Sequence, residues 1–306
     1  MSKTSQKYIA IIIIGVFVAG GIAPLLLRVN GGDDNSSSNN LTREDSITHG
    51  HGLAVDVQDP NKLFIATHHG LLVLMNDKDL YRVGKSTDDF MGFSPHPGDA
   101  NVLFSSGHPS LGGNIGFQKS DDGGFTWKKI SDGVEGPVDF HTMAVSSVNP
   151  NLIYGWYQGN LQRSIDQGKN WEIVNSDLQP IYLAADSQDE NVVYAATTQG
   201  QGVMVSQDQG ATWTSLSPQL QGGFVSVVAI HPTDSKTLLT FSEKLGGLGK
   251  STDAGKTWKK VSEEFNAEAV LFVAFSRIDP SIVYALTQEN KLYKSIDVGD
   301  TWVKIS

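Results

Sequence analysis

The sequence predicts an all-β fold, a six-bladed β-propeller, on three observations. An eight-residue pattern, Ser-x-Asp-x-Gly-x-Thr-Trp, recurs along the chain. Its tryptophans, at positions 127, 171, 213, 258 and 302, are 44, 42, 45 and 44 residues apart. A fixed period of about 20–50 residues indicates repeated units that bury their cores against their neighbours. Short apolar and β-branched runs, separated by turn residues, precede each copy, which is typical of an all-β repeat.

The recurring octapeptide is predicted to be a tight turn between two strands. Its Asp carboxylate can accept hydrogen bonds from backbone N–H groups, and the Gly two positions later can adopt a positive φ. The Trp can bury a large apolar surface. We therefore expect a structural role, rather than catalysis or calcium binding, for the residues that recur: Asp122, Asp166, Asp208, Asp253, Asp297, Trp127, Trp171, Trp213, Trp258 and Trp302.

A sixth, degenerate unit precedes the first octapeptide. The runs Gly70–Met75 and Leu80–Val83 occupy the places of a third and a fourth strand, and Tyr81 stands 46 residues before Trp127. Six units then begin near His49, so the propeller is expected to span residues 47–306. The last unit ends on its own outer strand, which leaves no spare strand for the first blade. We therefore expect the ring to close by packing between blades one and six.

The octapeptides resemble those of the Asp-box, or BNR, repeat family of β-propellers. This family includes sialidases, the sortilin luminal domain, some glycoside hydrolases and photosystem II assembly factors. The resemblance extends from about His49 to Ser306. It implies that each octapeptide lies on the hairpin between the third and fourth strands of a blade, away from any functional site.

The composition excludes several classes of function. The chain has 33 acidic and 23 basic residues, a formal net charge of −10, and no cysteine. Nucleic-acid binding requires a basic surface, so we expect no nucleic-acid partner. Disulfides, a thiol nucleophile and cysteine-ligated zinc are excluded outright.

The N-terminus is predicted to anchor the chain in a membrane. The run Ile9–Leu27 is almost wholly apolar and long enough to cross the hydrocarbon layer as one helix. Lys3 and Lys7 precede it, which places residues 1–29 as a cytoplasmic stub and a transmembrane anchor. Residues 30–46 are small and polar and are expected to form a flexible linker. The propeller would then lie on the extracytoplasmic side of the cell membrane; the alternative is secretion after signal cleavage.

Histidines mark one face of the expected ring. His96 and His231 fall in turns on the face that carries the octapeptides. Six others lie at the start of first strands or the end of second strands, which meet on the opposite face: His49, His51, His68, His69, His108 and His141. Imidazoles with carboxylate or thioether neighbours suit zinc or copper, and Asp139, Met91 and Met143 are candidate accessories. The alternative is a set of separate loop histidines without a metal.

Two enzymatic hypotheses follow from the resemblance. A sialidase is not expected, because that family binds a carboxylate with three arginines at its site. The arginines inside this propeller are Arg82 and Arg163, beside outer-strand hairpins, and Arg277, near a turn on the octapeptide face. A glycoside hydrolase needs only a pair of carboxylates. Its candidate catalytic residues are on the histidine-bearing face: Asp139, Glu243 and Glu289.

The remaining class is a non-catalytic binding or assembly module, and we favour it. An anchored, exported propeller offers a rigid face to a protein or glycan partner. Trp156, Tyr157 and Phe224 near the histidine-bearing face are candidate contact residues, or else pack between blades.

Overall fold

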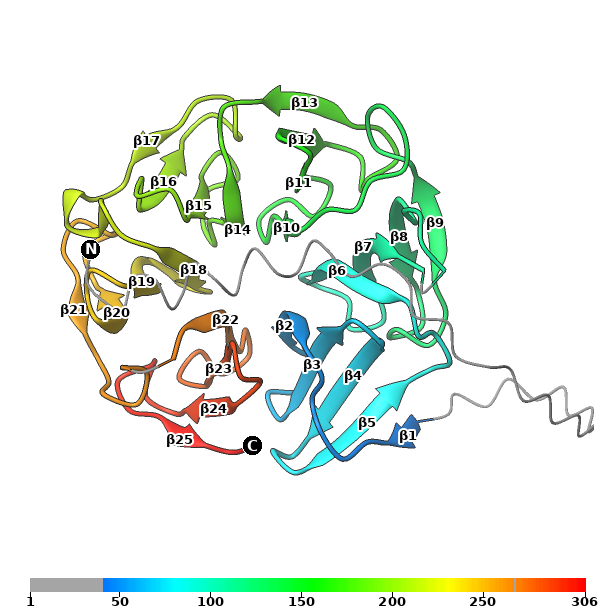
Figure 1. The fold of residues 1–306 in the computed structure, drawn as a ribbon, viewed down its shortest axis with the longest axis horizontal. Helices are drawn as coiled ribbons and strands as arrows, with labels where there is room; N and C mark the ends of the chain where they lie inside the picture. The colour runs from blue at the N-terminus through cyan, green and yellow to red at the C-terminus, as the bar shows by residue number, and fades with distance from the viewer. Residues whose placement is uncertain (1–40, 110, 267) are drawn as a thin grey trace, which may run out of the picture. The chain divides into compact units, whose positions relative to one another are not determined.

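A computed structural model describes residues 41–109, 111–266 and 268–306 of the chain. The described residues form six antiparallel β-sheets arranged as blades around a central axis (Figure 1). The expected all-β, six-bladed propeller is therefore confirmed. Each blade takes its four strands from one continuous stretch of chain, in order from the axis outward. Blade one carries an additional outer strand, β1 (Leu41–Arg43).

The first three blades have the following strands. Blade one contains β2 (Gly50–Val55), β3 (Lys62–Thr67), β4 (Gly70–Met75) and β5 (Asp79–Val83). Blade two contains β6 (Asp89–Pro95), β7 (Leu103–His108), β8 (Phe117–Ser120) and β9 (Lys128–Ser131). Blade three contains β10 (Thr142–Val145), β11 (Ile153–Tyr157), β12 (Asn160–Ser164) and β13 (Glu172–Asn175).

The last three blades follow the same order. Blade four contains β14 (Pro180–Ala185), β15 (Val193–Thr197), β16 (Val203–Ser206) and β17 (Thr214–Ser215). A 3-10 helix, η2 (Pro218–Leu220), leads to blade five, which contains β18 (Val225–His231), β19 (Asp234–Ser242), β20 (Gly247–Ser251) and β21 (Lys259–Lys260). Blade six contains β22 (Val270–Phe275), β23 (Val283–Thr287), β24 (Leu292–Ser295) and β25 (Val303–Lys304).

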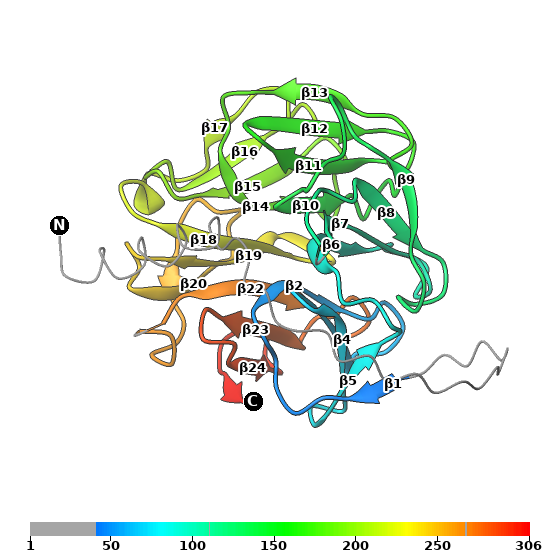
Figure 2. The ribbon, with the colours of Figure 1, turned by 45° about the vertical axis from the view of Figure 1, so that its right-hand side comes forward.

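The strand order gives the ring two different faces, and Figure 2 shows the ring obliquely. On the histidine face, each innermost strand begins and each second strand ends. On the octapeptide face, the first strand turns into the second and the third turns into the fourth. All five octapeptides lie between third and fourth strands, for example Ser251–Trp258 between β20 and β21.

The core of the protein lies between blades rather than within one sheet. At the boundary of blades one and two, Phe64 and Leu71 pack against Phe90 and Leu103, and all four side chains are buried. In blades two to five, the octapeptide tryptophan packs toward the preceding blade, as Trp127 does at this boundary. Burial of such apolar surface stabilises each blade through its neighbour.

Each octapeptide turn satisfies its own polar groups. In blade four, Asp208 Oδ1 accepts hydrogen bonds from the Ser206 hydroxyl (2.7 Å) and the Thr212 N–H (2.8 Å). Its Oδ2 accepts from the Thr212 hydroxyl (2.6 Å), and Trp213 Nε1 donates to the Gly210 carbonyl (2.9 Å). Blade three keeps the same pattern, since the Asn170 amide replaces the Thr hydroxyl. The carboxylates of these turns are therefore used locally.

The ring closes without a shared strand. Blade one consists of N-terminal strands and blade six of C-terminal strands, and their boundary contains Leu53, Ile65, Tyr284 and Leu286. Polar contacts add to this packing. Asp77, in the turn between β4 and β5, accepts a hydrogen bond from the Tyr284 hydroxyl (2.8 Å) and pairs with Lys294 (2.6 Å). The expectation that closure rests on packing between blades one and six agrees with this arrangement.

The N-terminal expectations fall mostly outside the described residues. The predicted anchor at Ile9–Leu27 lies there, as does most of the predicted linker. Within the described part of the chain, no helix has the length and apolar character needed to span a membrane. Three residues of the predicted linker, Leu41–Arg43, form β1 and pair with β5 in antiparallel register.

Candidate metal centre

The strand registers allow positions in different blades to be matched. Val55, Pro95 and Val145 pair with Leu63, Leu103 and Ile153, so each holds the same place in its blade. The positions four and six residues before these lie at the entrance of the inner strand. In three consecutive blades, both positions carry side chains that can bind a metal ion. These are His49 and His51 in blade one, Asp89 and Met91 in blade two, and Asp139 and His141 in blade three.

A third matched position lies after the second strand. Counting forward from the same registers, His68 of blade one and His108 of blade two occupy it. Blades four to six differ. Their residues in the place of His51 are Ile181, Ser226 and Leu271, matched through the same pairing. At these matched positions of the inner-strand entrance, side chains that can bind a metal are therefore confined to blades one to three.

Local backbone geometry presents His51 on the histidine face. The register of β2 shifts between Gly50 and Gly52, which makes His51 the extra residue of a β-bulge. Bulges re-aim side chains and occur beside functional sites. Packing favours the flanking glycines, because a Cβ on Gly50 would lie 2.4 Å from the Leu286 side chain and one on Gly52 would lie 3.0 Å from Phe93.

Three imidazoles of blade one converge. His51 Nε2 lies 3.1 Å from His68 Nε2, and the His49 ring stacks on the His68 ring with centroids 4.7 Å apart. One ring nitrogen from each of His49, His51 and His68 lies within 4.8 Å of the others. This spacing allows the three side chains to share one ion.

Blade two supplies a buried carboxylate and a thioether to the same group. Asp89 is 3% exposed; its Oδ2 accepts a hydrogen bond from His68 Nδ1 and lies 3.3 Å from His108 Nε2. Its Oδ1 lies 3.6 Å from His51 Nδ1 and makes no hydrogen bond. Met91 Sδ contacts His51 Nδ1. Buried polar atoms are nearly always paired, so the unpaired Asp89 Oδ1 requires an explanation.

Counting hydrogens shows what the group lacks. If His68 is neutral and donates from Nδ1 to Asp89, its Nε2 presents a lone pair to His51. A neutral His51 has one hydrogen. Placed on Nε2, it leaves the Nδ1 lone pair facing Met91 Sδ and Asp89 Oδ1; placed on Nδ1, it leaves two Nε2 lone pairs facing each other. With neutral imidazoles, a cation would complete either arrangement.

The electrostatics keep several donors in the form that binds metals. Burial lowers the pKa of His51 to about 3, against the opposing charge of Asp89, so this imidazole is neutral at ordinary pH. Burial alone would raise the pKa of Asp89. The hydrogen bond from His68 and the neighbouring imidazoles hold it below its ordinary value instead. Neutral imidazole and ionised carboxylate are the ligand forms that metal ions require.

Blade three adds a second carboxylate–histidine pair. His141 Nε2 lies 3.5 Å from Asp139 Oδ2, and the interaction with Asp139 raises the pKa of His141. Asp139 is buried and its Oδ1 has no hydrogen-bond partner. His141 also interacts electrostatically with His51 and Asp89, which places this pair beside the blade-one group.

Other candidates from the sequence lie elsewhere. His69 is exposed, with its ring centroid 6.4 Å from that of His68, and Met143 is buried in the core between blades two and three. The carboxylates proposed for catalysis have separate surroundings. Glu243 Oε2 accepts from the Phe224 N–H (3.4 Å), and Glu289 pairs with Lys291 (2.7 Å).

Sequence reasoning missed Asp89, whose carboxylate lies against His51, His68 and His108. Asp89 is the first residue of β6, and its matched positions in the neighbouring blades are His49 and Asp139. Aligning the repeats by their inner strands, rather than by the octapeptides alone, would have placed it in the set. The aromatic candidates have structural partners: Trp156 Nε1 donates to the Leu178 carbonyl (3.0 Å), and Phe224 is buried.

Comparisons with known proteins agree with the fold. No family model matches the chain. Over 202 residues it is 28% identical to a xyloglucanase of Hypocrea jecorina (strain QM6a), an alignment that covers 64% of this chain and 23% of the relative. The chain thus spans less than a quarter of this relative's length, and it is similar in sequence to part of a glycoside hydrolase.

Solved structures with the same fold include a xyloglucanase and a peptide-bound propeller. The GH74 xyloglucanase of Xanthomonas campestris superposes with a TM-score of 0.56 at 18% identity, covering 87% of this chain and 47% of that one. YCF48 bound to D1 peptide superposes with a TM-score of 0.56 at 16% identity, covering 88% and 86%. At these identities the likeness shows the propeller fold alone.

Proposed function

We propose that this protein is a membrane-anchored, extracytoplasmic Asp-box propeller that binds a transition-metal ion on its histidine face and acts without catalysis. His51 and His68, with Asp89 and Met91 as neighbours, would hold the ion. His49, His108 and the Asp139–His141 pair would complete or flank the site. The observation that carries the proposal is the group of lone pairs around His51, which lacks a cation when the imidazoles are neutral.

Copper suits this donor set better than zinc. Zinc sites use nitrogen, thiolate and carboxylate ligands, whereas a thioether is a soft donor that selects copper, above all Cu(I). Of the six residues at the two matched entrance positions of blades one to three, Met91 is the one with a sulfur atom. We expect Met91→Leu to weaken copper binding more than zinc binding, measured by competition with a chromophoric chelator.

Metal content is the deciding measurement. The full chain, purified without a histidine tag, should carry about one metal ion by elemental analysis. His51→Ala and His68→Ala should each abolish this content. His96→Ala and His231→Ala are matched controls, because they remove the same side chain from the opposite face. Absence of metal from the wild-type chain after copper or zinc loading, or equal losses in the controls, would refute the metal site.

We also propose how the chain is placed at the membrane and what it binds. We assign residues 1–29 to a cytoplasmic stub and membrane anchor, 30–46 to a linker and 47–306 to the propeller, with secretion after cleavage as the alternative. A protein partner is supported by the YCF48 structure, since that propeller of the same fold is bound to a peptide. A glycan partner is supported by the similarity to a xyloglucanase.

Glycoside hydrolysis is the second candidate function, favoured by that same similarity. Its carboxylates would be Asp139, Glu243 and Glu289, which come from blades three, five and six. A hydrolase needs two carboxyl groups about 5–10 Å apart. Release of reducing ends from xyloglucan or aryl glycosides, lost in Glu243→Gln or Asp139→Asn, would establish this function in place of the non-catalytic one.

A further inference from the structure

The opposite end of the ring contains a second feature, a cavity on the axis. It has a volume of about 210 Å³ and is lined by residues of all six innermost strands and the turns that follow them. Because those turns lie on the octapeptide face, the cavity is separate from the metal centre. Taking ~30 Å³ as the volume per water molecule, it has room for on the order of seven waters or one small organic molecule.

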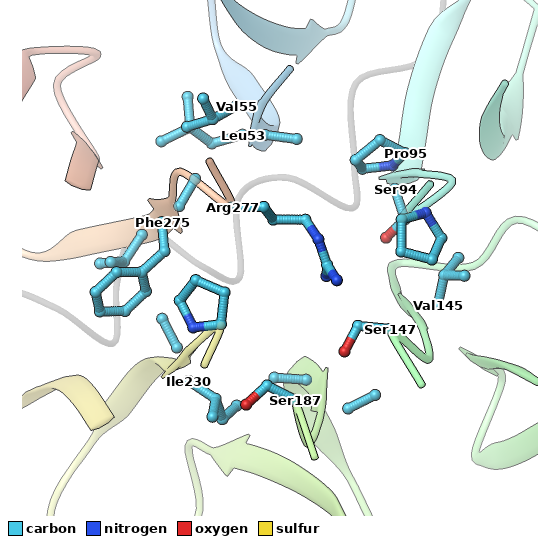
Figure 3. A pocket seen from close by; sticks show the side chains of 18 of the residues that line it. Leu53, Val55, Ser94, Pro95, Val145, Ser147, Ser187, Ile230, Phe275 and Arg277 are labelled. Atoms are coloured by element: carbon cyan, nitrogen blue, oxygen red, sulfur yellow. The ribbon is translucent and has the colours of Figure 1, made fainter. Parts of the chain in front are cut away.

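One position per blade forms a ring around this cavity. The strand registers match Val57, Pro97, Ser147, Ser187, Pro232 and Arg277, each two residues beyond the equivalent inner-strand position, and all six line the cavity. Five of the six are uncharged. Arg277 is the exception, and its guanidinium extends from blade six across the cavity toward Ser94 and Ser147 (Figure 3).

Arg277 has no carboxylate partner among the residues that the structure describes. The Arg277 side chain is exposed overall; partial burial of the guanidinium lowers the pKa of Arg277, and no neighbouring charge opposes this shift. Two acidic residues directly precede cavity-lining residues, and both are engaged elsewhere: Asp186 accepts from the Ser235 hydroxyl (2.6 Å), and Asp56 pairs with Lys62 (2.8 Å). Asp279, two residues after Arg277, accepts from the Ser281 hydroxyl (2.5 Å). Among the described residues that line the cavity, the guanidinium is thus the single cation, and the other side chains are apolar or hydroxylated.

We propose that this cavity binds a small monocarboxylate with an apolar body. The guanidinium provides the planar pair of N–H donors that matches a carboxylate. Hydroxyls of Ser94 and Ser147 lie on the opposite side, where each donates a long hydrogen bond (3.4 Å) to a backbone carbonyl. Val57, Ile230 and Phe275 supply apolar wall. A single cation selects a single negative charge, and the modest volume excludes a polymer. The net charge of −10 makes a local site, rather than the general field, responsible for attraction of an anion.

Benzoate and its neutral isostere benzamide test this proposal by titration calorimetry on the full chain. We expect benzoate to bind about one per chain and benzamide to bind at least tenfold more weakly. Arg277→Gln should weaken benzoate at least tenfold, and Arg277→Lys should weaken it less. Lys236→Gln is the matched control, because it removes one positive charge from an exposed site near the start of β19, beside the β18–β19 turn of the same face.

The opposing outcomes are specific. Equal affinity for benzoate and benzamide, no effect of Arg277→Gln, or equal displacement of benzoate by chloride at the same concentration would overturn the carboxylate site. Circular dichroism and the melting temperature verify that Arg277→Gln is folded. His51→Ala should leave benzoate binding unchanged, so the result is independent of whether the metal centre exists.

Discussion

The two faces of the ring use the same residue type, aspartate, in opposite ways. On the octapeptide face, Asp208 receives three hydrogen bonds from Ser206 and Thr212 of its own turn and is largely exposed. On the histidine face, Asp89 is 3% exposed, has one oxygen without a hydrogen bond and is surrounded by imidazoles. An aspartate whose donors come from its own turn builds the fold. An aspartate whose donors are imidazoles of other segments, and which keeps an oxygen without a hydrogen bond, can accept a ligand.

The largest expected effect concerns the scaffold. Trp258 is 3% exposed and lies in the core between blades four and five, so Trp258→Ala should lower the free energy of unfolding by about 3–5 kcal/mol. Trp213→Ala, in the same place of the preceding octapeptide but only partly buried, should cost less. Urea denaturation followed by circular dichroism measures both. Equal losses would mean that the octapeptide, rather than burial between blades, determines the contribution of the Trp.

The second effect separates the two kinds of aspartate. Asp89→Asn removes the charge that orients His68, and loss of such a partner typically weakens metal binding about 10–100-fold. Asp208→Asn should leave the metal affinity unchanged. Competition with a chelator of known affinity gives both values. A similar loss in the two variants would show that Asp89 acts through general stability and not through the histidines.

The sequence predicted the scaffold in detail because each octapeptide is satisfied by residues inside it. Asp253, for example, accepts hydrogen bonds from Ser251 and Thr257, so the turn can be predicted from eight consecutive residues. The six blades, their order and the degenerate first unit followed from this local pattern and its period. The histidine face was predicted only in outline. Asp89 and His51 are 38 positions apart, and only the strand registers show that they meet.

Arg277 was missed as a ligand-binding candidate for a related reason. In the sequence it is one polar residue in a turn between Ser276 and Ile278. Its position becomes informative when the matched residues of the other five blades, all uncharged, are placed around the same cavity. Such a residue can be recognised only by comparing matched positions in different blades. The period of the hydrophobic pattern alone does not provide that comparison.

A third effect tests the boundary where the ring closes. Asp77 occupies the turn of blade one that has no octapeptide, and its donors come from blade six: the Tyr284 hydroxyl and Lys294. Tyr284→Phe removes one donor to a carboxylate that retains the other, and should lower the free energy of unfolding by about 1–2 kcal/mol. Tyr194→Phe is a control with a comparable buried hydroxyl to Asp186 within blade four. If only the control destabilised the protein, closure would rest on apolar packing alone.

The smallest effect is the acid sensitivity of a single octapeptide. Hydrogen bonds from Thr212 and Ser206 lower the pKa of Asp208 from 3.8 to about 2. A carboxyl group whose pKa is lower in the folded state stabilises the fold above its unfolded pKa, and this contribution is lost as the pH falls from about 4 to 2. Because Asp208 is exposed, solvent screening keeps the contribution small. The melting temperature of Asp208→Asn should therefore fall slightly less than that of the wild type between pH 5 and pH 2.5. Identical slopes would mean that the turn binds the neutral and ionised side chains equally, and the contrast with Asp89 would then lie in burial alone.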